Sequence, residues 1–414
     1  MRTALMLALV LVTTQRGAES RLATNHRGAE SPAAYSDVAS AVARRSGSVA
    51  RAFPASARPE IWRASARRAE APEARRQQAR DQNTTLTAVE GLKVGHHTLA
   101  ERPTGCTVIL VDGDATGGVA QMGGAPGTRE TDLLHPLNMV DKVNAIVLSG
   151  GSAFGLDAAG GAVRWLDEHN IGWPTASGRV PIVPAAILFD LGVGGNSRVR
   201  PTADCGYKAA AAASITPVEE GSIGAGAGAT VGKLGGQAEH DGYPAGSRKP
   251  MKAGVGSSSI ALSNGLVVAA LVAVNAVGDI VDPATGKIVA GVLNPDGTFA
   301  DARKILRTGQ TIRRPRPAEN TTIGVVATNA RLTKDQANRM ALMANDGCAR
   351  AIVPSHTLGD GDTIFALATG RWSGDVDVTT IGALAAEAMA DAIVRAATRA
   401  TSVAGITAAR DLKK

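Results

Sequence analysis

The stretch PAENTTIGVVATNARLTKDQ, from Pro317 to Gln336, decides the fold. A polar run ends at the bond between Asn320 and Thr321, and the apolar segment TTIGVVAT begins immediately after it. An apolar run of this length, rich in β-branched residues, predicts a buried strand. The segment LTKDQANRMALMANDGCARAI follows and predicts a helix with Thr333 as its N-cap, because a threonine side chain can accept a hydrogen bond from a free backbone N–H group.

Strands and helices alternate from residue 85 to the end of the chain. AFGLDAAGGAVRWLDEH, which starts at Ala153, predicts a helix that packs closely through its glycines. Residues 282–316 are polar and rich in turn-forming residues. The order predicts mixed sheets covered by helices, and it does not distinguish two stacked sheets from one doubly wound sheet. Further strands are expected at 106–111, 145–148, 266–275 and 364–369, and a last helix at 381–397.

The composition predicts a core of small aliphatic side chains and excludes several kinds of partner. Hydrophobic residues make up 44% of the chain and aromatic residues only 3%. The net charge of +7 arises entirely in residues 1–81, which contain 14 Arg, no Lys and 7 acidic residues, so the rest of the chain is neutral. A nucleic-acid surface needs clustered basic side chains, and a membrane span needs about 20 apolar residues. We therefore expect neither a nucleic-acid nor a membrane partner.

Residues 1–84 predict a disordered, Arg- and Ala-rich tail without sustained periodicity. Met1-Arg2 and the apolar run at 4–12 are typical of a secretory signal, but no convincing cleavage site follows. A cytoplasmic location is therefore favoured over a periplasmic or secreted one, which would require residues 1–20 to act as a signal peptide.

The cysteines do not indicate a metal or redox site. Cys106, Cys205 and Cys348 lie far apart and form no CxxC pair. We expect three buried thiols.

Several motifs together resemble the family of DmpA-like aminopeptidases, which includes L-aminopeptidase/D-esterases, β-peptidyl aminopeptidases and the 6-aminohexanoate (nylon) oligomer endohydrolases. The run Asn320-Thr321-Thr322-Ile323 and the later HTLGDGDTIF, at 356–365, are most similar to the nylon-oligomer hydrolases. The resemblance extends over about 85–397 through PTGCTVIL at 103–110, LSGGSAFGLDAAGG at 148–161, GSIGAGAGATVGK at 221–233 and VNAVGDIVD at 274–282.

The resemblance implies a four-layer α/β/β/α sandwich of the N-terminal-nucleophile type and a chain that cuts itself between Asn320 and Thr321. The products would be an α-part, residues 85–320, and a β-part, residues 321–414, which assemble as cleaved units into a homotetramer. The chemistry suits these residues, because a threonine hydroxyl needs a neighbouring base and a new α-amine, with a reference pKa of about 8, supplies one. Nucleophile, base and oxyanion donor all come from the chain, so no metal or organic cofactor is expected.

Four further residues match catalytic positions of the family. Asp360 and Asp362 match two aspartates beside the nucleophile, and in an extended segment their side chains would point the same way. Asn275 matches an amide donor to the oxyanion, a role that a neutral NH2 group can fill. Lys233 matches a lysine near the nucleophile in the nylon-oligomer hydrolase. A solvated turn at the aspartates and a capping role for Asn275 are the structural alternatives.

Other residues compete for roles in the site. Ser257, Ser258 and Ser259 form a rival nucleophile cluster, although they are more typical of the start of a strand, and Thr322 would become the nucleophile if cleavage fell one residue later. Glu130 or Asp132 could bind a substrate ammonium, although a surface turn explains both carboxylates equally well.

The expected function is hydrolysis of amide bonds at the N-terminal residue of short peptides, amino-acid amides or β-peptides. Alternatives are endo-hydrolysis of 6-aminohexanoate oligomers, acyl transfer of the kind that ornithine acetyltransferases perform, and an uncleaved relative that acts as a binding protein.

Overall fold

The computed structural model describes residues 83–234, 247–309 and 319–412, all of which belong to the compact unit that spans residues 63–414. The tail predicted for residues 1–84 lies outside the described residues except for its last two. Of these, Asn83 is buried, and its side chain donates a hydrogen bond to Thr87 at 2.9 Å. Among the described residues, no helix has the length and apolar character needed to cross a membrane.

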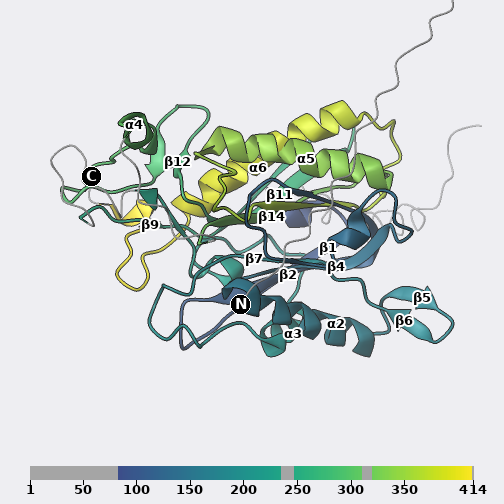
Figure 1. The fold of residues 1–414 in the computed structure, drawn as a ribbon. Coiled ribbons are helices and arrows are strands. Elements are labelled where there is room, and N and C mark those ends of the chain that lie inside the picture. The colour runs from purple at the N-terminus through teal and green to yellow at the C-terminus, as the bar shows by residue number, and fades with distance from the viewer. Residues whose placement is uncertain (1–82, 235–246, 310–318, 413–414) are drawn as a thin grey trace, which may run out of the picture. The chain divides into compact units, whose positions relative to one another are not determined.

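A bent sheet forms the centre of the described fold (Figure 1). Its strands are β1 (Leu92–Thr98), β2 (Gly105–Gln121), β3 (Thr128–Arg129), β4 (Lys142–Ser149), β7 (Ala185–Ile187), β10 (Val255–Ala261), β11 (Val267–Asn275), β14 (Thr321–Thr328) and β16 (Thr363–Ala368). Their order is β10-β11-β14-β16-β2-β4-β7-β3, with β1 paired to β2. The long β2 serves both halves, because residues 116–121 pair with β16 and residues 105–111 pair with β1.

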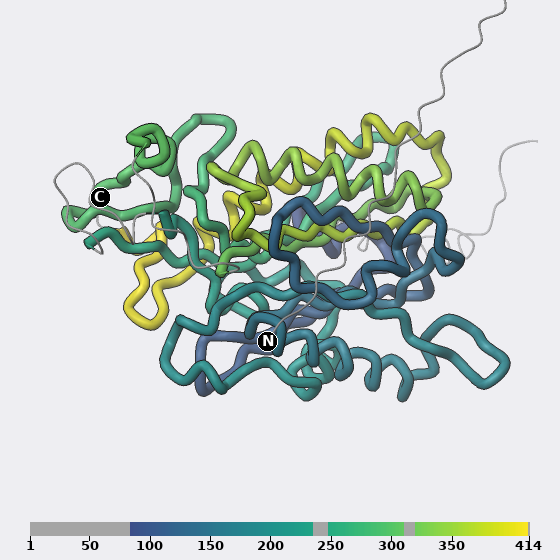
Figure 2. The backbone as a smooth tube through the Cα atoms, in the orientation of Figure 1, coloured from purple at the N-terminus to yellow at the C-terminus, as the bar shows by residue number. Residues whose placement is uncertain are grey.

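Three apolar clusters separate four layers. The central cluster joins side chains of β1, β2 and β4 with side chains of β11, β14 and β16, so the two halves of the sheet face each other. A second cluster packs α5 (Lys334–Ala351) and α6 (Val378–Thr398) on one half, and a third packs α2 (Ala158–Glu168) and α3 (Ala203–Ala211) on the other. Figures 1 and 2 show these helix pairs on opposite sides of the strands. The α/β/β/α layering is thus present.

The local sequence explains the central elements. In β14, Ile323 and Val325 face the central cluster and Val326 faces α5 and α6, so the strand is buried on both faces as predicted. Helix α5 begins with a capping box: the Thr333 side chain accepts from the backbone N–H of Gln336, whose side chain accepts from the backbone N–H of Thr333. The predicted N-cap is confirmed.

Two segments differ from the expectation. The helix predicted from Ala153 begins as a 3-10 helix, η3 (Ser152–Asp157), and becomes an α-helix only at Ala158. Residues 282–316, which were expected to consist of turns, also contain β13 (Ile288–Ala290) and α4 (Ala302–Arg307). The smaller elements are η1 (Leu86–Ala88), η2 (Asp132–Leu134), β5 (Trp173–Thr175), β6 (Gly178–Val180), η4 (Gly224–Gly226), β8 (Thr230–Val231), β9 (Met251–Lys252), β12 (Asp279–Val281), β13 (Ile288–Ala290), α4 (Ala302–Arg307), β15 (Ile352–Val353) and η6 (Ala409–Asp411).

The expectation of three free thiols is wrong for two of the cysteines. Cys106 of β2 and Cys205 of α3 form a disulfide with a Cα–Cα distance of 6.2 Å, which is within the usual range. Cys348 is free and buried. The pair is separated by 99 residues, so no local spacing indicates it.

Glycines allow α2 and α3 to pack closely. A Cβ added to Gly161 would lie 1.7 Å from the carbonyl oxygen of Ala203, and one added to Gly206 would lie 1.8 Å from that of Ala158. The neighbouring Gly160 has only the guanidinium of Arg129 near its would-be Cβ, at 3.9 Å. The close packing predicted from these glycines is confirmed.

We expect Gly161→Ala to lower the free energy of unfolding by about 1–3 kcal/mol, because the helices must separate to admit the methyl group. Gly160→Ala is the matched control in the same helix, and it should raise the free energy of unfolding by about 0.5–1 kcal/mol through helix propensity. Urea denaturation of both variants measures the difference, and equal effects of the two substitutions would contradict the close crossing.

Candidate functional site

Thr321 is the first residue of β14 and lies beside Asn275, the last residue of β11. The two residues are directly opposite in the antiparallel register, so their side chains share one face of the sheet. The Thr321 hydroxyl donates a hydrogen bond to the carbonyl oxygen of the preceding residue, Asn320. All three residues are buried.

The acidic loop before β16 lies on the other side of the junction. Because β16 runs parallel to β14, both strands begin at the same edge, and Asn320 forms a parallel bridge with Asp360. The Gly361 N–H donates to the Asn320 carbonyl oxygen at 2.9 Å. One carboxylate oxygen of Asp362 accepts from the backbone N–H of Thr322 at 2.6 Å. The structure therefore brings both predicted aspartates to the predicted cleavage junction.

The segment after β2 fixes this loop from outside. The N–H of Met122 donates to the Asp362 carbonyl at 3.0 Å, and that of Ala125 donates to the Asp360 carbonyl at 2.8 Å. A Cβ on Gly123 would lie 2.3 Å from the Asp360 carbonyl oxygen, so glycine is required for this approach.

Lys233 and Asn275 share a set of hydrogen bonds next to the junction. The Lys233 ammonium donates to the backbone and side-chain oxygens of Asn275, both at 2.9 Å, and to the Glu319 carbonyl at 3.2 Å. The Asn275 amide nitrogen donates to the Phe189 carbonyl at 2.8 Å and to the same Glu319 carbonyl at 3.3 Å. Both donors thus lie at the peptide that precedes Asn320.

Burial sets the electrostatics of the site. Removal from water lowers the pKa of Lys233 to about 7, against the opposing charges of Asp360, Glu319 and Asp190. Burial also raises the pKa of Asp360, and the nearby Asp362 carboxylate raises it further. One oxygen of Asp360 accepts from the N–H and the hydroxyl of Thr357, while the other is buried without a hydrogen-bond partner in the described residues. A base with a pKa near neutrality and an acceptor free for a new donor lie at one junction.

His356 also lies at the site, although the sequence alone predicted no role for it. Its backbone N–H and its Nδ1 both contact Asp362 Oδ2, at 3.1 and 2.8 Å. The only sequence signal was its place in the HTLGDGDTIF motif. The Gly361 N–H was also missed, since a backbone donor leaves no residue-type signal.

The predicted substrate-binding carboxylates make other contacts. A carboxylate oxygen of Glu130 accepts from the Val183 N–H at 3.1 Å, and Asp132 is exposed at the start of η2. In the described residues, neither forms a hydrogen bond or ion pair with the junction.

The rival nucleophiles occupy different environments from Thr321. The hydroxyl of Ser257, in β10, donates to the Ala270 carbonyl and accepts from the Leu86 N–H, as expected for a residue inside a strand. Thr322 follows Thr321 in an extended strand, so its side chain points to the opposite face of the sheet.

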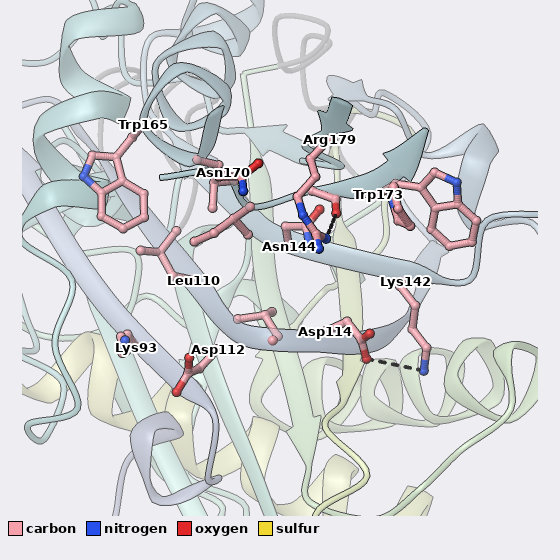
Figure 3. Close-up of a pocket in the computed structure, with 16 residues that line it drawn as sticks. Lys93, Leu110, Asp112, Asp114, Lys142, Asn144, Trp165, Asn170, Trp173 and Arg179 are labelled. Atoms are coloured by element: carbon pink, nitrogen blue, oxygen red, sulfur yellow. Dashed lines mark hydrogen bonds and ion pairs between the residues drawn. The ribbon is translucent and has the colours of Figure 1, made fainter. Parts of the chain in front are cut away.

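A cavity of about 520 Å³ lies elsewhere, between β2, the end of α2 and the β5–β6 hairpin (Figure 3). Trp165 and Trp173 lie at opposite ends of it, and none of the candidate residues lines it. The described residues contain no group of three or more His, Cys, Asp or Glu side chains placed to hold a metal ion.

The layered fold is that of the N-terminal-nucleophile hydrolases. A β-aminopeptidase from Burkholderia sp. superposes with a TM-score of 0.56 at 23% identity, over 79% of this chain and 91% of that one. The L-aminopeptidase D-Ala-esterase/amidase from Ochrobactrum anthropi, described as a variant of the Ntn hydrolase fold, gives a TM-score of 0.55 at 20% identity, over 77% and 86% of the two chains.

The chain belongs to peptidase family S58, whose sequence pattern matches residues 84–238 and 245–410. An uncharacterized aminopeptidase of Mycobacterium tuberculosis is 42% identical over 357 residues, which cover 79% of this chain and 97% of the relative. A 6-aminohexanoate-oligomer endohydrolase of Kocuria sp. is 30% identical over 324 residues, 74% of this chain and 84% of the relative. The protein is therefore a hydrolase of peptide or amide bonds.

The depressed pKa of Lys233 makes stability depend on pH. The unfolded chain keeps this proton up to about pH 10.5, whereas the folded chain releases it near pH 7, so between these values the unfolded state binds more protons and folding is favoured as pH rises. The free energy of unfolding of a Lys233→Met variant, compared with that of its parent, should therefore be highest below pH 7 and should fall towards pH 10.

Urea denaturation at several pH values measures this difference, and Thr321→Ala in both chains excludes any effect of the self-cleavage expected from the sequence. A pH-independent difference would show that folding does not lower the pKa of Lys233.

Proposed function

We propose that the chain cleaves its own Asn320-Thr321 bond and that Thr321 then hydrolyses amide bonds at the amino-terminal residue of short peptides or amino-acid amides. The observation that carries this proposal is the hydrogen bond from the Thr321 hydroxyl to the Asn320 carbonyl. The hydroxyl lies against the peptide group that it would attack.

Self-cleavage would begin with attack of Thr321 Oγ1 on the Asn320 carbonyl carbon. The Gly361 N–H, already 2.9 Å from the carbonyl oxygen, would stabilise the negative charge that develops there. Collapse breaks the C–N bond, and the nitrogen takes a proton and becomes the α-amine, while the Asn320 acyl group moves to Oγ1. Water then hydrolyses this ester. Lys233 in its neutral amine form is the candidate acceptor of the hydroxyl proton, since burial brings its pKa to about 7 and so makes this form available near neutral pH.

Cleavage would also free the groups that the mature enzyme needs. Lys233 and the Asn275 amide donate to the Glu319 carbonyl in the uncut chain, so departure of residues 319–320 releases donors for a substrate oxyanion. The new Thr321 amine would act as the base for its own hydroxyl, and the buried, unpaired oxygen of Asp360 is a suitable acceptor for its N–H groups.

Amino-terminal substrates are favoured by the relatives, because the Mycobacterium tuberculosis protein and both solved structures carry aminopeptidase names. Endo-hydrolysis of 6-aminohexanoate oligomers is the alternative, supported by the 30% identity to the Kocuria enzyme. The two differ in whether a free substrate amine is required. We expect no cofactor in either case, and we propose that the cleaved parts assemble as a homotetramer.

Thr321→Ala should yield one intact chain, whereas the unmutated protein should yield two fragments, one of which begins TTIGVV. Intact mass and N-terminal sequencing measure this. Thr322→Val is the matched control and should still be cut, because the buried Thr322 hydroxyl has no hydrogen-bond partner in the described residues and valine keeps the strand. An intact Thr321→Ala chain that still hydrolyses amides would remove Thr321 as the nucleophile.

N-acetylation of an alanine amide or a short alanine peptide should abolish hydrolysis if the protein is an aminopeptidase, because the acetyl group removes the charge that the site must bind. Initial rates with free and acetylated substrates, and with a linear 6-aminohexanoate oligomer, measure the preference. Equal rates on free and acetylated peptides would exclude the aminopeptidase and favour the endohydrolase.

A further inference from the structure

The His356 ring contacts two oxygens that can only accept hydrogen bonds. Its Nδ1 lies 2.8 Å from Asp362 Oδ2, and its Nε2 lies 3.4 Å from the backbone carbonyl oxygen of Asn345 in α5. A neutral imidazole has one N–H group, so it can satisfy only one of these acceptors. Both contacts are made together only by the doubly protonated imidazolium.

The surrounding charges favour the same state. Burial by itself would lower the pKa of His356, but the hydrogen bond and charge of Asp362, the Asn345 carbonyl and the more distant Asp360 raise it above its ordinary value. In α5, burial and the charge of Asp362 raise the pKa of the Cys348 thiol, so this thiol adds no charge near Asp362. Asp279, on the neighbouring β12, directs its carboxylate to the N–H groups of Val292 and Ala302.

The backbone at His356 adopts an unusual conformation to make these contacts. Its φ of 56° lies in the left-handed region, which is uncommon for a residue other than glycine. This conformation aims the backbone N–H and the ring at the same oxygen of Asp362. The ring remains partly accessible, with 18% of the side chain exposed against 2% for Asp362.

Asp362 connects this pair to the nucleophile. While Oδ2 accepts both contacts from His356, Oδ1 accepts from the backbone N–H of Thr322 at 2.6 Å. Thr322 is joined to Thr321 by one peptide bond, so rotation of the Asp362 carboxylate would shift the first residue of β14.

We propose that His356 is a positioning residue: as an imidazolium, it holds the Asp362 side chain fixed against the Thr322 N–H, and thereby sets the position of the Thr321 hydroxyl and of the amine that cleavage releases. This inference rests on the proposed function of Thr321.

The consequence is a loss of turnover as pH rises. Below its raised pKa, His356 is charged and both ring nitrogens donate hydrogen bonds. Above this pKa, one ring nitrogen has lost its proton, so its lone pair faces an oxygen that can only accept, and that hydrogen bond is lost. The α-amine of Thr321 must be neutral to act as a base, so kcat should also fall at low pH, where this amine is protonated. Lys233 also titrates near pH 7 and could contribute to the pH profile of kcat. The part of the profile that changes on substitution of His356 is the part that depends on His356.

The experiment compares the pH dependence of kcat and KM for alanine amide hydrolysis in the unmutated protein and in His356→Asn. Asparagine tolerates the left-handed conformation and keeps a neutral N–H donor, so the substitution removes mainly the charge. We expect kcat to fall about tenfold, as for a lost charged hydrogen bond, with KM changed by less than about twofold and with the alkaline limb displaced. Loss of self-cleavage in this variant would support the same role, since Asp362 already holds Thr322 in the uncut chain.

The matched control is His169→Asn, because His169 is exposed and its Nδ1 contact, at 2.6 Å, is with the Trp165 carbonyl of its own helix. This variant should keep the parent profile. An unchanged kcat and pH profile in His356→Asn would overturn the proposal.

A direct titration covers the case in which His356→Asn does not fold. Nitrogen chemical shifts of His356 in the intact Thr321→Ala chain should show a doubly protonated ring persisting above pH 6.5, and Asp362→Asn should lower the midpoint. A singly protonated ring at pH 6.5 would overturn this inference alone, whereas hydrolysis by Thr321→Ala would overturn the proposed function.

Discussion

The parallel pairing of β14 with β16 is the constraint on which the site depends. The register that places Ile323 opposite Thr363 makes both strands begin at one edge of the sheet. Asn320 therefore lies beside Asp360, and the Gly361 N–H reaches the Asn320 carbonyl. On the other side of β14, antiparallel pairing brings the last residue of β11 opposite its first. Strands from three distant parts of the sequence thus converge on one peptide bond.

A second layer of buried polar groups holds the surroundings of Asn275. Its amide nitrogen donates to the Phe189 carbonyl, and the next residue, Asp190, forms an ion pair with Arg102 at 2.8 Å in which both side chains are fully buried. The same carboxylate accepts from Thr104 and from the Gly151 N–H. Both carboxylate oxygens of Asp190 accept hydrogen bonds, so its charge is not isolated in the core. The network therefore fixes the segment at Phe189 and Asp190 that contacts Asn275.

The sequence predicted those features that depend on neighbouring residues. The strand after Asn320 and the cap at Thr333 follow from local patterns, and the structure contains both. The stacking of two sheets came from family resemblance, because local patterns do not determine which strands pair across a bend in β2. The Cys106–Cys205 disulfide was unpredictable for the same reason.

Residues of the candidate site could be predicted from the sequence where they belong to a recognisable motif. They could not be predicted where their role depends on the three-dimensional arrangement of the backbone. Asp360 and Asp362 came with their motif and lie at the junction. His356 stood in the same motif, but its role arises from a left-handed backbone conformation that residue type does not reveal. Glu130 had a suitable charge, yet its carboxylate accepts from the Val183 N–H.

The interleaving of strands has a consequence for the lifetime of a cut molecule. Residues 321–414 contribute β14 and β16, which lie between β11 and β2 of the preceding part of the chain. If the chain were cut after Asn320, neither piece would contain the complete sheet, so unfolding would separate two molecules and refolding would depend on their concentration. The separated pieces would expose unpaired strand edges, which favour aggregation. Cleavage would thus make unfolding irreversible whenever the separated pieces aggregate faster than they reassemble.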